Sequence, residues 1–267
     1  MSIPSDPVGA KIGETKGCTI KLLPRHQWVP AAKRAIAVNP ANAPMVQMLH
    51  QGAAASVIHP ERLALLTAKY WGPDGVHLTV SFLDNPAKDL RARILQHMNA
   101  WAAYANVEFV EVASDGQVRI ARSAGDGYWS YLGTDILAIP TPEPTMNLDS
   151  FTMDTPDSEF VRVIRHETGH TLGFPHEHLR SEIVNRINRR KAIRYYRENQ
   201  GWTPDVTVQQ VLTPLDNSDL TATAAADEDS IMCYWLPASI MIDHREVLGG
   251  KDINATDGEF AGSLYQK

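Results

Sequence analysis

The chain has 267 residues, a formal net charge of -6, 43% hydrophobic residues and 21% charged residues. This length suits one large domain or two lobes around a cleft, and the composition excludes a disordered or low-complexity protein. The acidic balance argues against nucleic acid or an anionic membrane as the main partner, and no apolar run is long enough for a membrane span.

Residues 1–70 differ from the rest of the chain because they are rich in scattered proline and alanine and show weak periodicity. We expect an N-terminal extension, of the kind that a pro-segment would form, which wraps or masks the main domain. Short helices are expected near 29–38 and 60–70. With only Cys18 and Cys233 in the chain, no disulfide framework is expected.

Elements with a clear pattern begin at residue 76. Alternation of apolar and polar residues predicts a strand over 76–82. Asn85 and Pro86 then open a helix whose apolar face runs from Leu90 to Trp101. Further short strands are expected at 107–112, 117–121, 128–133, 136–140 and 145–149. A second long helix is expected to begin after Pro156 and to end near Leu172.

Regular patterns become sparse beyond Gly173. We expect a polar helix from about 186 to 199, mostly loop over 201–250, and a terminal helix that starts at the capping-box spacing of Thr256 and Glu259. The predicted fold class is α+β. A mixed sheet with two long helices forms an upper lobe to about residue 173, and an irregular lower lobe covers 174–267.

The motif that carries chemistry is HETGHTLGFPHEH at residues 166–178. His166 and His170 are four residues apart, so on a helix they project from one face and can bind one metal ion. Gly173 can adopt the positive φ that ends the helix and turns the chain, which brings His176 round as a third ligand. Three protein nitrogens that leave a position open for water are typical of a catalytic zinc site, with one Zn²⁺ per chain.

Glu167 lies beside the first ligand and is placed to reach a zinc-bound water as general base. The segment SIMCYW at 230–235 follows the third histidine by some fifty residues and contains Met232, as expected for a methionine turn beneath such a site. The remaining seven histidines, His178 among them, are expected to be surface or hydrogen-bonded residues and not ligands.

On HETGHTLGFPHEH, SIMCY, WSYLG at 129–133 and TDGEFAGSLY near the end, the chain over residues 71–267 resembles the astacin-like metzincins. The resemblance implies a twisted five-stranded sheet with two helices above a lower lobe that contains the Met-turn and a terminal helix. It implies that Tyr234 is a switchable fifth ligand and oxyanion stabiliser. It also implies that Glu177 matches the acidic residue that holds a processed N-terminus.

The strand with Trp129, Ser130, Tyr131 and Leu132 resembles the edge that pairs with an extended polypeptide substrate. The expected activity is therefore zinc-dependent hydrolysis of internal peptide bonds through a water activated by Glu167. Cys233 stands where the astacin pattern has histidine, and the usual cysteine pairs are missing. These departures affect the assignment to a subfamily and the implied role of Glu177. They do not affect the expected metal ligands.

Two other functions stay open at this point: a binding or effector protein whose zinc lobe is inactive or structural, and hydrolysis of a non-peptide amide. The sequence does not specify the natural substrate or the oligomeric state. We expect a secreted protein, although the first residues lack the basic and apolar regions of a secretion signal. A further hypothesis is that the thiolate of Cys18 occupies the open zinc position and keeps the enzyme latent.

Overall fold

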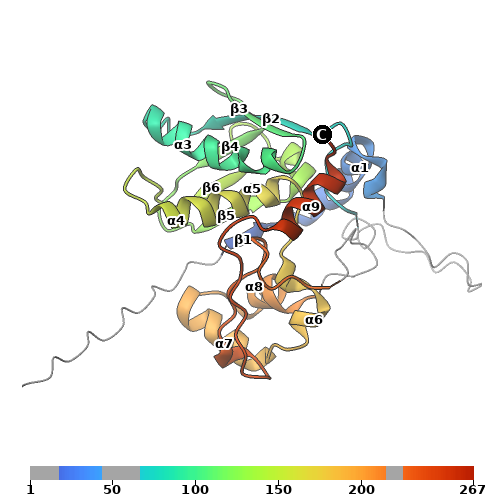
Figure 1. Ribbon diagram of the computed structural model, residues 1–267, viewed down its shortest axis with the longest axis vertical. Helices are drawn as coiled ribbons and strands as arrows, with labels where there is room; N and C mark the ends of the chain where they lie inside the picture. The colour runs from blue at the N-terminus through green and yellow to red at the C-terminus, as the bar shows by residue number, and fades with distance from the viewer. Residues whose placement is uncertain (1–17, 44–66, 215–224) are drawn as a thin grey trace, which may run out of the picture.

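The fold is built on a mixed sheet. The computed structural model describes residues 18–43, 67–214 and 225–267 (Figure 1). Among these, six strands lie in the order β1-β5-β6-β4-β2-β3. Their bounds are β1 Cys18–Lys21, β2 Val76–Phe82, β3 Val107–Glu111, β4 Val118–Ala121, β5 Tyr128–Tyr131 and β6 Met146–Leu148. Neighbouring strands are parallel except for β5 and β6, which are antiparallel.

The sixth strand comes from the N-terminal extension. The resemblance implied five strands, and β1 is added beside β5, where a partner strand satisfies the backbone groups of an otherwise open edge. Helix α1 (Trp28–Val38) follows, flanked by the short 3-10 turns η1 (Arg25–Gln27) and η2 (Pro40–Asn42), and it contacts the turn η5 (Gly133–Ala138). The helix expected at 60–70 falls largely outside the described residues.

Two long helices pack on the sheet. Helix α3 (Lys88–Met98) continues into the turn η4 (Asn99–Ala103). The second helix runs as α4 (Asp157–Glu159), a π-helical turn η6 (Phe160–Ile164) and α5 (Arg165–Thr171). Helix α3 contacts β3 and α5, and α5 contacts β5, so both helices lie against the sheet (Figure 1). The π-helical turn stands directly before the histidine motif, and such turns are frequent at functional sites.

The lower lobe is a group of short helices joined by long loops. Its elements are η7 Glu177–Leu179, α6 Ser181–Val184, α7 Arg189–Gln200, α8 Pro204–Thr207, the π-helical turn η8 Val208–Leu212 and η9 Ala238–Ile240. Helix α9 (Ala255–Leu264) then returns to the upper lobe, where the fully buried Tyr265 donates its hydroxyl to the carbonyl of Leu172 at 2.5 Å. This bond ties the end of the chain to the C-terminal end of α5.

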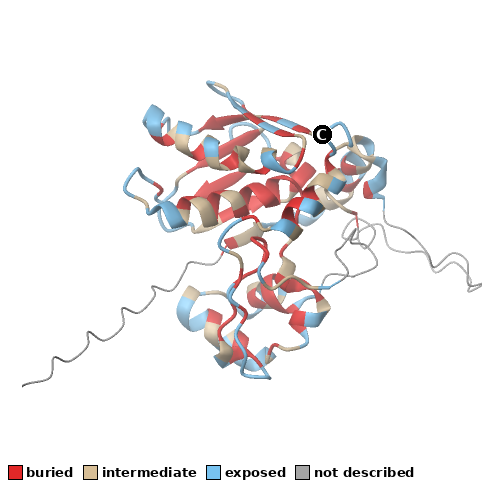
Figure 2. Cartoon of the chain, viewed as in Figure 1, coloured by how far each residue is buried: buried red, intermediate tan, exposed pale blue. Residues whose placement is uncertain are grey.

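The described residues form two hydrophobic cores. The larger core contains the inner sides of β2 to β6 and of the two long helices, and the smaller core lies in the lower lobe. Figure 2 shows that the helix containing α5, between the two lobes, is buried along most of its length. In this part of the chain no helix combines the length and the apolar character that crossing a membrane would require.

Two sequence-based expectations about elements were wrong, and a third was incomplete. Residues 136–140 are not a strand: 136–138 belong to η5, which begins at Gly133 with φ of 46° and closes local turns, and 139–140 follow it. A short apolar run does not by itself distinguish strand from helical turn. The described part of 201–250 is mostly loop, as expected, but it also holds a helix over 204–212, which is capped by Thr203 with proline in its first turn. The capping box of α9 is formed by Asn254 and Asp257, not by Thr256 and Glu259.

Candidate metal centre

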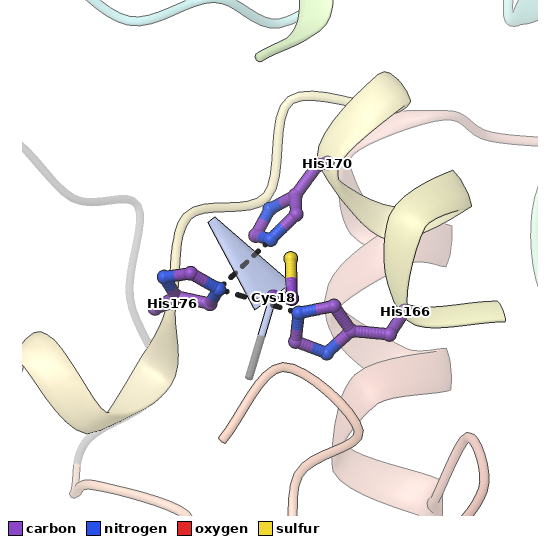
Figure 3. A group of neighbouring side chains, drawn as sticks. All are labelled: Cys18, His166, His170 and His176. Atoms are coloured by element: carbon purple, nitrogen blue, oxygen red, sulfur yellow. Dashed lines mark hydrogen bonds between the residues drawn. The ribbon is translucent and has the colours of Figure 1, made fainter. Parts of the chain in front are cut away.

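The histidine motif folds as the spacing predicts. His166 and His170 lie on α5, and the chain reverses at Gly173, whose φ is 100°. A Cβ at Gly173 would lie 3.0 Å from the carbonyl oxygen of Lys69, so this position favours glycine for space as well as conformation. The reversal brings His176 back toward the helix, and all three imidazoles are buried (Figure 3).

The three rings present their Nε2 atoms to one point. The Nε2 of His176 lies 3.3 Å from that of His166 and 3.0 Å from that of His170. The Nδ1 of His166 is 2.6 Å from the carbonyl oxygen of Ile231, and the Nδ1 of His170 is 2.7 Å from that of Phe174. These carbonyls require a proton on Nδ1, which leaves each Nε2 as a bare acceptor. Converging, buried, unprotonated nitrogens fit a zinc ion.

Cys18 of β1 supplies a fourth donor atom. Its Sγ and one nitrogen of each of the three histidines all lie within 4.8 Å of one another. In Figure 3 the sulfur points into the space between the three rings. Three histidines and one cysteine can complete a tetrahedral zinc site. The position that a catalytic site keeps for water is therefore next to the thiol of Cys18.

Met232 lies beneath the helix that carries the ligands. An ideal Cβ at Gly169 would overlap the Sδ of Met232, so the sulfur occupies the space that glycine leaves between His166 and His170. The turn before Met232 is fixed by Asp257 of α9, which accepts hydrogen bonds from the hydroxyl of Ser230 at 2.6 Å and from the backbone N–H of Ile231 at 2.9 Å. The carbonyl of Ile231 is the one that orients His166, so α9 positions a ligand indirectly.

Glu167 is fully buried beside the ligands. Its Oε2 accepts a hydrogen bond from the hydroxyl of Ser130 on β5 at 2.9 Å, while its Oε1 is buried and accepts no hydrogen bond from a described residue. Burial raises the pKa of Glu167 to about 7, and the side chains of Cys18 and Ser130 act against that rise. A buried carboxyl group with one oxygen anchored and the other without a hydrogen bond, next to metal-binding histidines, has the arrangement of a general base.

Tyr234 lies over the rings of the third ligand and its neighbour. Its ring centroid is 4.3 Å from that of His176 and 4.3 Å from that of His178, with which it stacks at an interplanar angle of 15°. The hydroxyl of Tyr234 is buried, forms no hydrogen bond of normal geometry with a described residue, and interacts with the side chain of Cys18. Burial raises the pKa of Tyr234 well above its ordinary value, so the phenol stays protonated and can donate.

Burial keeps the ligand histidines neutral. It lowers the pKa of His166 to about 4, and it lowers the pKa of His170 and His176 well below the ordinary value, with the neighbouring imidazoles acting in the same direction. Neutral imidazole is the form that binds a metal ion. Burial and the nearby Glu167 raise the pKa of the Cys18 thiol, and a bound divalent cation would oppose both effects because a coordinating thiol loses its proton.

The strand predicted to bind substrate is covered in this structure. Trp129, Ser130 and Tyr131 lie in β5 and Leu132 follows it, but β5 is not an edge strand because β1 pairs with it along Cys18–Lys21. Ser130 points inward to Glu167, as already described. Trp129, Tyr131 and Leu132 can therefore pair with an extended substrate only after β1 has left β5.

Glu177 has partners within the described part of the chain. Its Oε1 accepts from the backbone N–H of Asp227 at 3.1 Å and lies 3.7 Å from the Nε of Arg180. Burial raises the pKa of this carboxyl to about 7. The first residues of the chain lie outside the described part, so contact between Glu177 and an N-terminus is not among the observed interactions.

Several residues at the site were not found by sequence reasoning: Ser130 as the partner of Glu167, His178 as the ring beneath Tyr234, Asp257 as the anchor of the methionine turn, and Gln210. Each acts through a contact with a residue distant in the chain. Asp257 alone carried a signal, the capping pattern at the start of α9.

The fold and the site together have the features of the metzincin class. Two histidines and a glutamate on one helix, a third histidine after a glycine turn and a methionine beneath them are typical of this class. The sequence model of the astacin peptidase family matches residues 66–235. The chain belongs to the astacin family.

Individual relatives agree with this assignment. Zinc metalloproteinase nas-27 of Caenorhabditis elegans is 29% identical over 211 residues, which cover 77% of this chain and 44% of that protein. The chain thus spans less than half the length of this curated relative. Two solved structures of myroilysin are 30% identical over 74% of this chain; they are covered to 96% and 86% and have TM-scores of 0.69 and 0.58. The family and its zinc confirm the predicted fold class and cofactor.

Proposed function

We propose that this chain is a zinc-dependent endopeptidase that hydrolyses internal peptide bonds of extended polypeptides. The observation that carries the proposal is the buried convergence of three histidine nitrogens beside a carboxylate with one unused oxygen. His166, His170 and His176 would hold the zinc ion. When bound, zinc lowers the pKa of water toward about 7 and polarises a carbonyl group.

Glu167 is the proposed general base. Ser130 fixes its Oε2, so the unused Oε1 is the atom that takes the proton from the attacking water and later passes it to the leaving amine. A carboxyl whose pKa is about 7 is suited to both transfers near neutral pH, since it gains and loses a proton readily there. Tyr234 is the proposed donor to the developing oxyanion, because its phenol is protonated and the Cys18 side chain that interacts with it would leave together with β1.

The described chain has the arrangement of a latent enzyme. The side chain of Cys18 lies at the fourth metal position, and β1 occupies the strand position beside β5 that an extended substrate would need. We therefore propose that release of β1 activates the enzyme. This keeps the Cys18 hypothesis and extends it, since both the thiol and the strand backbone would block substrate.

The test needs a preparation freed of β1. The full chain, with an inserted recognition site for a sequence-specific protease between Lys21 and Leu22, is folded with zinc, cut and separated from residues 1–21. This product is called the cut chain below. Among described residues, every member of the larger core lies at Leu23 or later, so the cut removes none of that core.

The experiment is a peptide-library digest by the cut chain, read by mass spectrometry. Cleavage at internal peptide bonds is expected, with loss of activity in a zinc chelator and recovery when zinc is restored. Glu167→Gln should keep zinc and fold but lose about 10²–10⁴ in turnover, the usual range for a general base. Wild-type turnover by Glu167→Gln excludes this mechanism. A zinc-loaded cut chain that hydrolyses no peptide contradicts the proposed activity and leaves a binding protein or a non-peptide amidase.

A further inference from the structure

The side chain of Gln210 binds the backbone of β1 as a neighbouring strand would. Its Oε1 accepts from the backbone N–H of Ile20 at 3.2 Å, and its Nε2 donates to the carbonyl of the same residue at 3.1 Å. Gln210 lies in the π-helical turn η8 of the lower lobe, 190 residues away in the chain. One carboxamide thus pairs with both polar groups of one strand residue.

This contact is on the side of β1 that faces away from β5. The N–H and C=O of one residue in a strand point to the same side, and those of its two neighbours point to the opposite side. Since Ile20 directs both groups to Gln210, the adjacent residues direct theirs to β5, with which β1 is paired. The strand beside the metal ligands is therefore held between β5 in the upper lobe and Gln210 in the lower lobe.

Gln210 is buried, and its backbone contacts a residue of the candidate metal centre. It is 7% exposed, and its own carbonyl oxygen lies 2.9 Å from the Nε2 of His178. The ring of His178 in turn stacks on Tyr234. Gln210 is thus connected to the residue proposed to bind the oxyanion. It is also inside a π-helical turn, a feature that is frequent at functional sites.

A carboxamide can serve strands of either direction. It carries a donor and an acceptor on one carbon, and a half-turn about its last torsion exchanges their places. A substrate that replaces β1 therefore presents groups that Gln210 can bind whether it runs parallel or antiparallel to β5. In either direction, the backbone of the substrate has to pass between β5 and η8.

We infer that Gln210 is a substrate-binding residue that holds the backbone of the bound polypeptide opposite β5. This inference rests on the proposed endopeptidase function and deepens it. Ile20 is two residues from Cys18, the residue at the metal, so the contact falls about two residues, or roughly 7 Å, from the scissile bond. Gln210 then requires a substrate that extends at least this far on one side, which favours polypeptides over dipeptides and small amides.

The test compares cut chains that carry Gln210→Ala or Gln209→Ala. Gln209 is the exposed neighbour in the same turn and serves as the matched control. Substrates are a peptide of about ten residues with one cleavage site and two shortened versions, each of which retains a single residue on one side of the scissile bond. For the long peptide, Gln210→Ala should lower kcat/KM about tenfold, or ~1.4 kcal/mol, mainly through KM. Gln209→Ala should stay within about twofold of the parent.

The shortened peptides separate binding from a structural role. The peptide that lacks the residue facing Gln210 should be cleaved equally by parent and Gln210→Ala, while the other should keep the tenfold difference. Zinc content should be equal in all variants. An unchanged kcat/KM for the long peptide, or the same loss for all three peptides, overturns the role of Gln210 while the endopeptidase function stands. A zinc-loaded parent that cleaves no peptide overturns the function itself, and the inference with it.

Discussion

Three side chains of the candidate metal centre are each oriented by a contact from another segment of the chain. The carbonyl of Ile231 orients His166, the hydroxyl of Ser130 orients Glu167, and the ring of His178 supports Tyr234. The three histidines that could hold the metal themselves lie within eleven residues, 166–176. A chemically competent site thus needs the short motif and contacts with residues that are distant from it in the chain.

Tyr234→Phe tests the proposed oxyanion donor by removing its hydroxyl group. The ring should keep its stacking on His178, because only the oxygen is removed. Turnover by the cut chain should fall about 10²–10³-fold, since an oxyanion donor contributes roughly 2.7–4 kcal/mol in comparable sites. KM should change less, because the bond forms mainly in the transition state. The measurements are steady-state kinetics and a zinc assay on the same samples.

If Tyr234 only packs beneath the cleft, a different result is expected. Tyr234→Phe would then retain activity within a few-fold and show only a small change in melting temperature. His178→Leu is the companion variant, because it removes the stacked ring and leaves the phenol in place. It should lower turnover less than Tyr234→Phe, with zinc retained through His166, His170 and His176.

For individual residues, the sequence predicted which side chains come together at the site. It did not predict the contacts that orient them. The helical spacing of His166 and His170 and the turn at Gly173 are local, so a pattern in the sequence can express them. The contact between Ser130 and Glu167 joins residues 37 apart, and the contact between Gln210 and Ile20 joins residues 190 apart. Such bonds depend on tertiary packing and have no fixed spacing.

Among the secondary-structure elements, the closest packing is between α5 and the methionine turn. The Sδ of Met232 stands where a Cβ of Gly169 would be. Gly169→Ala should therefore force the sulfur or the helix to move, at about 1–3 kcal/mol, a typical cost of overpacking. Because Gly169 lies between two ligands, zinc affinity should fall as well. Urea denaturation and a zinc titration measure the two effects.

Met232→Ala is the matched partner for this prediction. It creates space where the new methyl group needs it, so the double variant should be more stable than the sum of the two single effects predicts. The interaction free energy from the double-mutant cycle should be about 0.5–3 kcal/mol, the range for residues in contact. Additive losses would show that Gly169 and Met232 do not share this space in solution.

His97 connects α3 with the π-helical turn η6, and it makes stability depend on pH. Its ring centroid is 5.6 Å from that of Phe160. Burial, then the nearby Arg165 and Arg93, lower the pKa of His97 below its ordinary value of 6.5. The unfolded chain therefore binds a proton at this residue more readily than the folded chain, so its contribution to stability is complete above about pH 6.5 and is lost as pH falls.

His97→Gln should reduce the loss of stability on acidification. As the pH is lowered from 7.5 to 5.5, the free energy of unfolding of the parent should fall relative to that of the variant. The fall should be well under ~1.4 kcal/mol per pH unit because His97 is partly exposed. Urea denaturation at several pH values, with zinc content checked at each, measures this difference. A parent that gains stability relative to the variant as pH falls would contradict the sign.

Elements with a clear period were predicted, and those fixed by tertiary contacts were not. The alternation over 76–82 gave β2, and the apolar face from Leu90 gave α3. The helix over 204–212 has β-branched residues and little propensity, and it is held by contacts of η8 with η7 and of Gln210 with β1. The run 136–140 fits either strand or turn by pattern, and the positive φ of Gly133 decides for the turn.

For the whole molecule, β1 is the element that joins the two lobes at the zinc site. It pairs with β5 above and with Gln210 below, and its Cys18 belongs to the smaller, lower core. The strand therefore occupies the position beside β5 that is proposed for the substrate. We expect two separate interactions to oppose activity: the thiol beside the three histidines, and the strand backbone beside β5.

The rates of three preparations separate these two interactions. The full chain should cleave peptides least, and the cut chain should cleave them fastest. Cys18→Ser in the full chain should lie between them, because it removes the thiolate but leaves β1 paired with β5 and Gln210. Initial rates on one peptide, with zinc content checked, measure this order. Equal rates for the three preparations would end the hypothesis of latency.

A spectroscopic readout tests the thiol without relying on activity. With cobalt(II) in place of zinc, the full chain should show the absorption of a thiolate-to-metal charge transfer, because Cys18 offers its sulfur beside the three histidine nitrogens. Cys18→Ser and the cut chain should lose this absorption. Cys233→Ser is the matched control: its thiol is also buried, but it lies outside the metal-binding group and should leave the spectrum unchanged. A full chain without the absorption would show that Cys18 does not bind the metal. The backbone of β1 would then be the only proposed block, and Cys18→Ser should leave the rate of the full chain unchanged.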